Sequence, residues 1–356
     1  MKKLIALTLV LMLCLTLSAC GNSAPGSTPA GSASSSSEAP SSAPASSMPE
    51  SEASQAASEP AEVAALKGPT AMGMVQLMEQ EAAGDAPQFH FEIAASADEL
   101  TPRLVQGTLD IAAVPANLAS VLYNNTEGKI RVLAVNTLGV LYLVESGDTV
   151  HSVEDLRGKT VYSSGKGSTP EYALTYMLSQ NGIDPETDVT IEWKSEHSEC
   201  VAALAAEENA IAMLPQPFVT TAQMKNENIR VALDLTKEWE NLSSTANTAA
   251  TLITGVVVAR AEYVEENPEQ VADFLSKYEA SVKYVTTDID GAAALVGKYD
   301  IVPEAVAKQA LPQCNITFLA GEEMREKLSA YLQILFEQNP KAIGGAMPGD
   351  DFYYLP

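Results

Sequence analysis

The stretch GKTVYSSGKGSTPE, residues 158–171, decides how the rest of this chain is interpreted. Residues 160–162 are strand formers, while Gly165 and Gly167 allow a tight turn and a close approach of the backbone to another group. Thr169 is a good N-cap for a helix. The stretch therefore predicts a strand, a glycine loop and a helix start, whose free N–H groups suit an anion or a carbonyl. An ordinary strand-to-helix turn would have the same pattern.

A second stretch, VAALKGPTAMG at residues 63–73, repeats the plan of strand, Lys-Gly loop and helix. In both cases a short apolar strand and a proline follow at a similar distance. Gly68 and Pro115 are 47 positions apart, and Gly167 and Pro215 are 48 positions apart. This near-equality predicts an α/β fold with two lobes of one plan. The loops of each lobe would lie at the carboxyl ends of its strands, where open α/β sheets bind ligands.

The order of strand-like and helix-like segments predicts how the two lobes share the chain. We expect the chain to cross between the lobes near Val144 and again near Leu252. The first lobe then consists of residues 63–143 and 252–356 and is discontinuous, while residues 144–251 form the second lobe. From Pro268 onward the pattern is mostly helical, and we expect these helices to pack on the first lobe.

The amino-terminal segment has the pattern of an export signal. Two lysines precede an apolar run at residues 4–17, which predicts a signal peptide at residues 1–19. The sequence LSAC that ends at Cys20 resembles the lipobox of bacterial lipoproteins, in which the cysteine is lipidated. This resemblance implies that Cys20 anchors the protein to the outer face of the cell membrane. Residues 20–62 are almost all Ser, Ala, Pro, Gly and Glu, which predicts a lipidated, disordered tether.

Charge and reactive residues argue against several other functions. The net charge of −25 makes the chain a poor partner for nucleic acid or for an anionic membrane surface. His90, His151 and His197 have no metal-ligand spacing and are expected at the surface or at strand edges. Cys200 and Cys314 are expected to be free thiols, although a disulfide between them is possible. We predict no cofactor, no metal and no catalytic residue.

Five motifs together resemble those of a known family. They are DLRGKTV at 155–161, GKGSTP at 165–170, DIA at 110–112 with PAN at 115–117, DLTKEW at 234–239, and IGGAMPGDDFYY at 343–354. In order and spacing they resemble bacterial solute-binding lipoproteins of the nitrate/sulfonate/taurine and thiamine-precursor binding group. These proteins have the type II periplasmic-binding-protein fold, in its thiamine-biosynthesis-like branch. The resemblance implies two mixed or parallel sheets flanked by helices, with a hinge and a ligand cleft between them.

The resemblance also implies a receptor that captures a small solute and delivers it to an ABC permease with its ATPase subunits. It places ten loop residues near the cleft: Gly68, Thr70, Ser96, Asn117, Ser164, Gly165, Lys166, Ser168, Thr169 and Gln216. Asn117 could contact the ligand or only cap the helix that follows it. The two Lys-Gly loops favour an anionic or zwitterionic ligand group near Thr70 or Ser168. A neutral ring stacked on Tyr162, Trp193 or Trp239 is the competing interpretation.

Two other functions stay open. An extracellular sensor that signals ligand occupancy to a partner protein would need the same cleft. The eukaryotic enzyme that makes the thiamine pyrimidine is a relative of the group, but its hallmark is a cysteine-rich run, and this chain has no cysteine cluster. We expect a monomer that is held at the membrane only by its lipid anchor and binds no nucleic acid.

Overall fold

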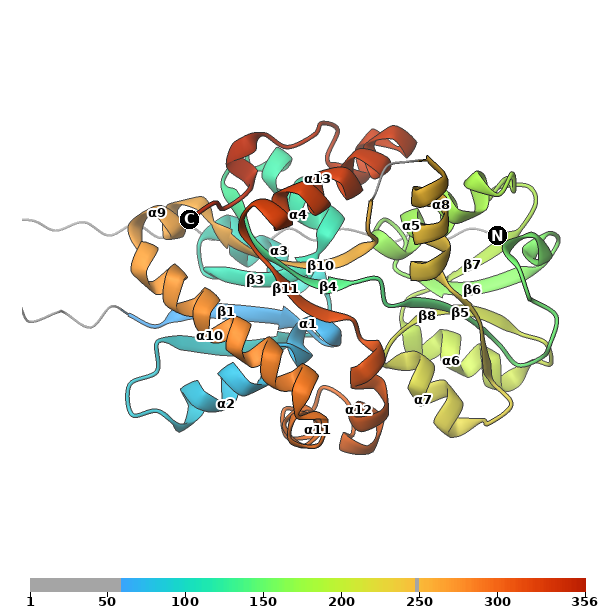
Figure 1. Ribbon diagram of the computed structural model, residues 1–356, viewed down its shortest axis with the longest axis horizontal. Coiled ribbons are helices and arrows are strands. Elements are labelled where there is room, and N and C mark those ends of the chain that lie inside the picture. The colour runs from blue at the N-terminus through green and yellow to red at the C-terminus, as the bar shows by residue number, and fades with distance from the viewer. Residues whose placement is uncertain (1–58, 247–249) are drawn as a thin grey trace, which may run out of the picture. The chain divides into compact units, whose positions relative to one another are not determined.

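The computed structural model describes residues 59–246 and 250–356. The expected signal peptide, Cys20 and the tether up to residue 58 lie outside these residues. The described chain is an α/β fold with two mixed sheets, each flanked by helices (Figure 1). The expected fold class is therefore confirmed.

The first sheet has six strands in the order β11-β4-β10-β3-β1-β2. β1, β2 and β3 are parallel, whereas β10 runs antiparallel to both β3 and β4, and β11 runs antiparallel to β4. β3, β4 and β10 are almost entirely buried, as expected for strands covered on both faces. The strands are β1 (Ala61–Leu66), β2 (Phe89–Ala94), β3 (Ile111–Pro115), β4 (Ile130–Leu138), β10 (Ile253–Arg260) and β11 (Ile316–Leu319).

The second sheet has five strands in the order β7-β6-β8-β5-β9. β6 is parallel to both β7 and β8, and β5 runs antiparallel to β8 and β9. The strands are β5 (Leu141–Glu145), β6 (Thr160–Ser164), β7 (Thr190–Lys194), β8 (Ile211–Pro215) and β9 (Arg230–Asp234).

The two sheets share one plan. In each sheet the strand before the glycine loop, β1 or β6, lies between the two parallel strands that follow it in sequence. The last parallel strand of each sheet, β3 or β8, then pairs with an antiparallel strand. This strand is β10 in the first sheet and β5 in the second. This confirms the repeated plan that the two glycine loops predicted.

Element boundaries differ from the expected ones by a few residues. β1 begins at Ala61, so residues 61 and 62, which we expected in the tether, belong to the first strand. The chain passes from the first sheet to the second between Leu138 and Leu141, earlier than the expected position near Val144. Val144 lies inside β5, where it pairs with Ala212 of β8. The return to the first sheet precedes Ile253, close to the expected position.

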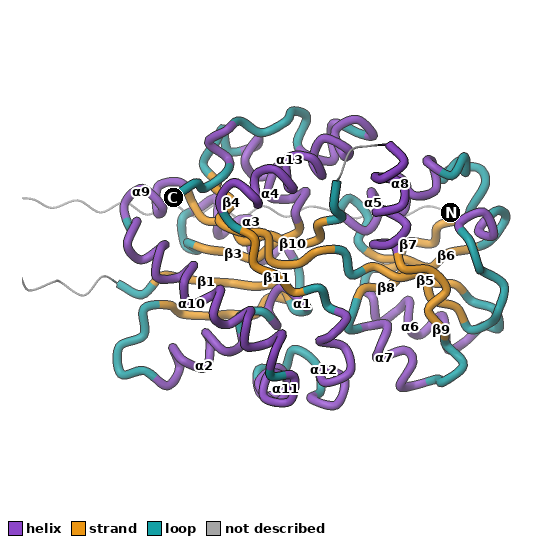
Figure 2. Tube along the Cα trace, viewed as in Figure 1, coloured by secondary structure: helices purple, strands orange, loops and turns teal. Residues whose placement is uncertain are grey.

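Helices cover both faces of each sheet (Figures 1 and 2). One face of the first sheet packs on α1 (Pro69–Met72), α2 (Val75–Ala83), α9 (Ala261–Glu266), α10 (Pro268–Thr287), α11 (Ile289–Lys298), α12 (Glu304–Ala310) and η2 (Leu311–Gln313). The other face packs on α3 (Ala97–Gln106), α4 (Ala116–Asn125), α13 (Gly321–Gln338), η3 (Pro340–Ile343) and η4 (Asp350–Phe352). The faces of the second sheet pack on η1 (Val153–Leu156), α5 (Thr169–Gln180) and α8 (Leu235–Ala246), and on α6 (His197–Ala206) and α7 (Phe218–Lys225).

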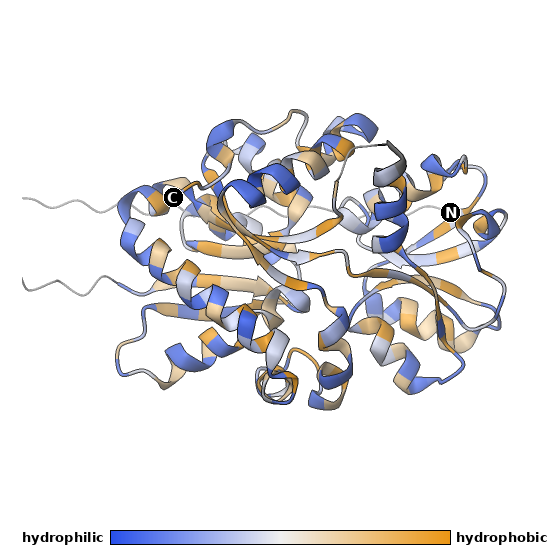
Figure 3. Cartoon of the chain, viewed as in Figure 1, coloured by the Kyte–Doolittle hydropathy of each residue, from blue (hydrophilic) through white to orange (hydrophobic). Residues whose placement is uncertain are grey.

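One apolar core runs from the first sheet into the second on the side of α5, α8 and α13. The strands are mainly apolar, while the outer faces of the helices are hydrophilic (Figure 3). Trp239 of α8 lies at the junction, with its ring centroid 4.5 Å from that of Tyr176 in α5 and 5.7 Å from that of Tyr331 in α13. Its Nε1 donates to the carbonyl of Ala250 at 3.1 Å. The core therefore joins helices of both sheets on this side.

The glycine loop after β6 has the predicted form, with one correction. The N-cap of α5 is Ser168, so Thr169 is the first helical residue rather than the cap. Gly165 and Gly167 have φ angles of 83° and 78°, which a residue with a side chain rarely adopts. The loop therefore contains two residues in the left-handed backbone conformation, separated only by Lys166, before the helix begins.

The two cysteines of the described chain are free, as predicted. Cys200 lies in α6, Cys314 lies between η2 and β11, and both are buried. Burial raises the pKa of the Cys200 thiol to about 11 and that of the Cys314 thiol to about 12. Both groups are therefore protonated and unreactive at neutral pH.

Candidate functional site

The carboxyl ends of the parallel strands in the two sheets lie against each other. Thr169, which opens α5 after β6, donates from Oγ1 to Oδ1 of Asn117, which lies in the first turn of α4 after β3, at 3.3 Å. Gln216, directly after β8, donates from Nε2 to Oε1 of Gln313 at 3.1 Å. These are two separate contacts between the sheets, and they involve three of the ten predicted residues, so we take the strand ends that they join as the candidate site.

Asn117 is fixed in this position by the carboxyl-terminal segment of the chain. Its side chain is 2% exposed, and its Nδ2 donates to the carbonyl of Ala342 in η3 at 3.2 Å. Ser120, one turn later in α4, donates to the carbonyl of Ile343 at 2.9 Å. The motif around residues 343–354 thus holds α4 in place, and Asn117 does not serve as the N-cap, which is Pro115.

Asn136 is a buried polar side chain that the sequence did not single out. It lies near the carboxyl end of β4 and is 0% exposed. Its Oδ1 accepts from Oγ1 of Thr137 at 3.1 Å, and its side-chain amide is a hydrogen-bonding neighbour of the buried Tyr278 hydroxyl. A Cβ atom on Gly255 of β10 would lie 2.5 Å from Asn136 Oδ1 and 2.8 Å from Cγ2 of Thr70. Asn136 and Thr70 therefore approach the backbone so closely that only glycine fits between them.

The remaining candidates on the first sheet have separate roles. Thr70 donates from Oγ1 to the carbonyl of Leu66 at 2.7 Å, and Gly68 is buried with a φ of 135°. Ser96 is exposed at the end of the edge strand β2, where it forms a capping box with Glu99. The described contacts of Ser96 do not bring it to Asn117 or Thr169.

Ser164 and His197 form a polar pair on the second sheet. Ser164 is the last residue of β6, and its Oγ shares a hydrogen bond with Nδ1 of His197, the first residue of α6. The imidazole packs on Phe218 of α7, with ring centroids 4.9 Å apart. Burial lowers the pKa of His197 to about 4, so the ring is neutral at pH 7. His197 was expected at the surface or at a strand edge; it is instead enclosed where β6, α6 and α7 meet.

His197 follows β7 at the carboxyl edge of the second sheet, and that position was the signal available in the sequence. A residue three positions beyond the end of a strand lies near the ligand edge of an open sheet whatever its spacing to other histidines. The spacing of the histidines carries no sign of the pairing with Ser164, which depends on the tertiary fold.

The glycine loop itself is closed by internal hydrogen bonds. The carboxylate of Glu171 accepts from the backbone N–H of Gly167 at 2.5 Å. Ser168 donates from Oγ to the carbonyl of Gly165 at 2.8 Å, and its own N–H donates to the same carbonyl at 3.1 Å. Part of the predicted anion-binding capacity of this loop is therefore used by the chain itself.

Neither loop lysine joins the contact between the sheets. Lys67 forms an ion pair with Asp300, with a distance of 3.8 Å between Nζ and Oδ2. Lys166 is exposed and lines a hollow of about 640 Å³ beside α5 and β7, together with Tyr172 and Trp193.

The three aromatic side chains considered as walls for a neutral ring are all engaged elsewhere. Trp239 is 2% exposed inside the shared core. The hydroxyl of Tyr162 donates to the carboxylate of Glu207, and its ring lies under the ammonium group of Lys194. Trp193 lines the hollow that contains Lys166.

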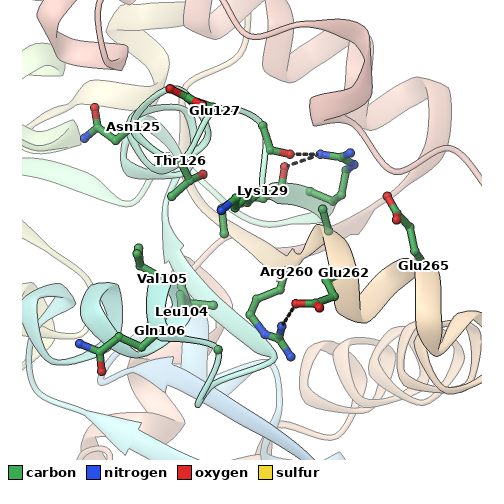
Figure 4. A pocket seen from close by; sticks show the side chains of 15 residues that line it. Leu104, Val105, Gln106, Asn125, Thr126, Glu127, Lys129, Arg260, Glu262 and Glu265 are labelled. Carbon is green, nitrogen blue, oxygen red and sulfur yellow. Dashed lines mark hydrogen bonds and ion pairs between the residues drawn. The ribbon is translucent and has the colours of Figure 1, made fainter.

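A larger hollow of about 740 Å³ lies at the opposite edge of the first sheet, where the parallel strands begin (Figure 4). It is bounded by the ends of α3 and α4, the start of β4 and the start of α9. Arg260 pairs there with Asp110 at 2.7 Å and with Glu262 at 3.1 Å, and Arg131 pairs with Asp351 at 3.4 Å. Its arginines are therefore already paired with carboxylates of the chain.

Within residues 59–246 and 250–356, no group of three His, Cys, Asp or Glu side chains could hold a metal ion. No helix in those residues has the length and apolar character needed to cross a membrane.

The chain matches the model of one protein family. That family is described as the periplasmic substrate-binding protein of a phosphonate ABC transporter, and the match covers residues 73–297. No protein with a curated description matches the chain. The resemblance seen in the sequence was to nitrate, sulfonate, taurine and thiamine-precursor receptors. Phosphonate receptors, which the family model describes, were not among them.

Similar solved structures share the fold. An ABC transporter protein from Parabacteroides distasonis has a TM-score of 0.69 and 22% identity, over 83% of this chain and 98% of that chain. The periplasmic aliphatic sulphonate binding protein SsuA from Escherichia coli has a TM-score of 0.66 and 18% identity, over 84% and 92%. The alkanesulfonate-binding protein SsuA from Xanthomonas axonopodis pv. citri, bound to MOPS, has a TM-score of 0.62 and 15% identity, over 82% and 97%.

Proposed function

Because this chain belongs to the family of periplasmic substrate-binding proteins of phosphonate-type ABC transporters, we propose that it captures a small solute between the strand ends of its two sheets. It then delivers this solute to a separate membrane permease. The observation that carries the proposal is the hydrogen bond between Thr169 and Asn117, because it joins the two edges at which open α/β sheets bind ligands.

The two sheets with their helices act as two lobes. The expected bounds, 63–143 with 252–356 for the first lobe and 144–251 for the second, are shifted so that the first lobe runs over residues 61–138 and 253–356 and the second begins at Leu141. Few residues need to change backbone angles when lobes that are linked by short crossings open and close.

The solute contacts come from both lobes. The first lobe contributes Thr70, Asn117 and Asn136 to the solute site. The second lobe contributes Ser164, Thr169, His197 and Gln216. This assignment is supported by their burial or partial burial at the facing strand ends. Gly68, Gly165 and Ser168 shape the loops, whereas Ser96 and Lys166 are peripheral.

The protein works outside the cytoplasm on a lipid anchor. Export by residues 1–19, lipidation of Cys20 and a tether up to about residue 60 place the two lobes near a permease. The support is the lipobox-like sequence LSAC and the low-complexity composition that follows it.

Recovery of the solute tests the proposed function. The protein is purified without added ligand and denatured, and the released small molecules are identified by mass spectrometry. The same is done with Asn136→Leu, which keeps the side-chain shape but removes the amide. A matched control is Asn125→Leu, whose side chain is exposed in the hollow of Figure 4. We expect a solute with the native protein and with Asn125→Leu but not with Asn136→Leu; equal recovery from all three would contradict this site.

A further inference from the structure

Thr169 opens a helix of the second lobe, but its hydroxyl meets side chains of the first lobe. The residue is 1% exposed, and its Oγ1 donates to Oδ1 of Asn117 in α4 at 3.3 Å. A second hydrogen-bonding neighbour of this hydroxyl is the hydroxyl of Tyr331, which lies in α13. Two separate helices of the first lobe therefore contact one hydroxyl group of the second lobe.

The directions of these hydrogen bonds follow from what each group can donate or accept. The carbonyl of Ala342 can only accept, so the Asn117 amide turns its NH2 group to Ala342 and its oxygen to Thr169. The amide oxygen also can only accept, so the Thr169 hydroxyl gives its one proton to Asn117. The oxygen of Thr169 is then left as an acceptor, and Tyr331 is the donor to it. The donors therefore form one chain that runs from Tyr331 to the carbonyl of Ala342.

The Tyr331 hydroxyl is held in place as a donor. The side chain is 0% exposed, and its ring centroid lies 5.7 Å from that of Trp239 in the apolar core. Because the ring is packed on all sides, it cannot turn its hydroxyl to solvent. Burial raises the pKa of Tyr331, so the hydroxyl keeps its proton at neutral pH. A buried hydroxyl without a partner is costly, which favours the contact with Thr169.

Tyr353 shows what an equivalent contact inside one lobe looks like. Its side chain is 7% exposed, and its hydroxyl has Ser329 of α13 as a hydrogen-bonding neighbour. Both of these residues belong to the first lobe. The hydroxyls of Tyr331 and Thr169 belong to different lobes instead, so their contact depends on how closely the two lobes approach each other.

We propose that Tyr331 is a positioning residue of the solute site. Its hydroxyl keeps the Thr169 hydroxyl directed at Asn117 and so holds the two lobes together around bound solute. This inference rests on the proposed function, because it concerns the same site. It goes beyond that function because it gives a role in solute retention to a side chain in the core of the first lobe.

Removal of the hydroxyl alone tests this role. Native protein, Tyr331→Phe and Tyr353→Phe are purified and dialysed, and the small molecule that the native protein releases on denaturation is quantified in each over time by mass spectrometry. We expect Tyr331→Phe to lose this molecule about 2- to 12-fold faster than the native protein, as for one neutral hydrogen bond. Tyr353→Phe should lose it at the native rate. Equal rates in all three proteins, or equally fast loss from both variants, would overturn the proposal.

A double-mutant cycle shows whether Tyr331 acts through Thr169. Thr169→Val removes the hydroxyl that accepts from Tyr331 and keeps a branched side chain. We expect Tyr331→Phe to cause no further increase in the rate of loss when it is added to Thr169→Val. If the two effects multiply instead, Tyr331 acts through general packing and the proposal is wrong.

A third measurement needs no solute. Amide hydrogen exchange is followed in dialysed protein for the first turns of α4 and α5. In Tyr331→Phe these turns should exchange about 2- to 12-fold faster than in the native protein, because the contact between the lobes opens more often. Tyr353→Phe should show native rates there, and native rates in Tyr331→Phe would overturn the proposal.

The two kinds of failure are distinguishable. A native protein that releases no small molecule on denaturation contradicts the proposed function. The exchange rates of the native protein, the single variants and the double variant then decide the role of Tyr331 by the same criteria.

Discussion

The side-chain amide of Gln216 donates to that of Gln313 at 3.1 Å and so joins the end of β8 to the segment before β11. Gln216 is fully buried, and its Oε1 also accepts from the backbone N–H and the hydroxyl of Thr220. Gln313 is exposed, but its carbonyl accepts from the hydroxyl of Tyr142 at 3.2 Å. Any separation of the two sheets at this point must break both contacts.

Gln313→Ala should therefore weaken solute retention without unfolding the protein. A neutral hydrogen bond of this kind contributes about 0.5–1.5 kcal/mol, which corresponds to a loss of affinity of about 2- to 12-fold. The measurement is the ratio of retained solute to protein after dialysis. Gln333→Ala is the matched control, because Gln333 is exposed and pairs with Glu337 within its own helix. Equal retention by both variants would show that this amide pair does not stabilise the closed form.

Gly255→Ala should destabilise the fold by about 1–3 kcal/mol, because the added methyl group has no room. The new Cβ would lie 2.5 Å from Asn136 Oδ1 and 2.8 Å from the methyl carbon of Thr70. Gly84→Ala is the control: its Cβ would meet no atom closer than 3.6 Å, and its φ of −80° is open to alanine. We expect that change to be neutral or stabilising by about 0.4–1 kcal/mol. Urea unfolding measures both values, and similar values for the two variants would refute the steric argument.

Stability should fall in mild acid because of His197. Burial lowers its pKa to about 4, whereas an unfolded histidine has a pKa of about 6.5. Between these pH values the unfolded chain binds a proton that the folded chain does not bind, so stability is lost as the pH falls from about 6.5 towards 4. The slope is at most about 1.4 kcal/mol per pH unit.

His197→Asn should flatten the pH dependence of the free energy of unfolding in that window. His151→Asn is the control, because the side chain of His151 is 63% exposed. The prediction fails if the slope between pH 6.5 and 4.5 is the same in the native protein and in His197→Asn.

Cys20→Ala should abolish lipid anchoring, since the lipobox-like stretch ends at this residue. Several acyl chains on one residue are needed for firm retention, because a single chain binds membranes only marginally. Labelling with a radioactive fatty acid, followed by membrane fractionation, measures the effect. Cys200→Ala is the control, since that thiol is buried in α6. Labelling that persists in Cys20→Ala would place the anchor elsewhere.

The fold was largely predictable because its strands and loops are local patterns. Each glycine loop is followed at nearly equal spacing by an apolar strand, β3 or β8, and the topology follows from the rules for open α/β sheets. The start of α5 was misplaced by one residue, since Ser168 and Thr169 are both good N-caps. Val144 was taken as the crossing because β5 and the end of β4 both look like strands and differ only in their pairing partners.

The chemistry of the candidate site was less predictable because side-chain directions depend on tertiary packing. Lys67 and Lys166 each precede a glycine in a loop after a strand, yet their side chains pair with Asp300 and line a separate hollow. Asn136 was not among the predicted site residues, yet it is fully buried beside Gly255 of β10. Asp300 and Gly255 lie more than a hundred residues from Lys67 and Asn136 in the sequence, whereas Lys166 lines its hollow with neighbours from α5 and β7.

The packing of Trp239 between Tyr176 and Tyr331 gives the protein an optical probe of its own state. The chain has two tryptophans, and Trp193→Phe would leave Trp239 as the single indole emitter. Its surroundings come from α5, α8 and α13, which belong to both halves of the structure. If these helices shift as solute enters, the emission wavelength and the quantum yield change without any attached dye. Titration of the Trp193→Phe protein in a fluorimeter would then follow solute uptake in real time.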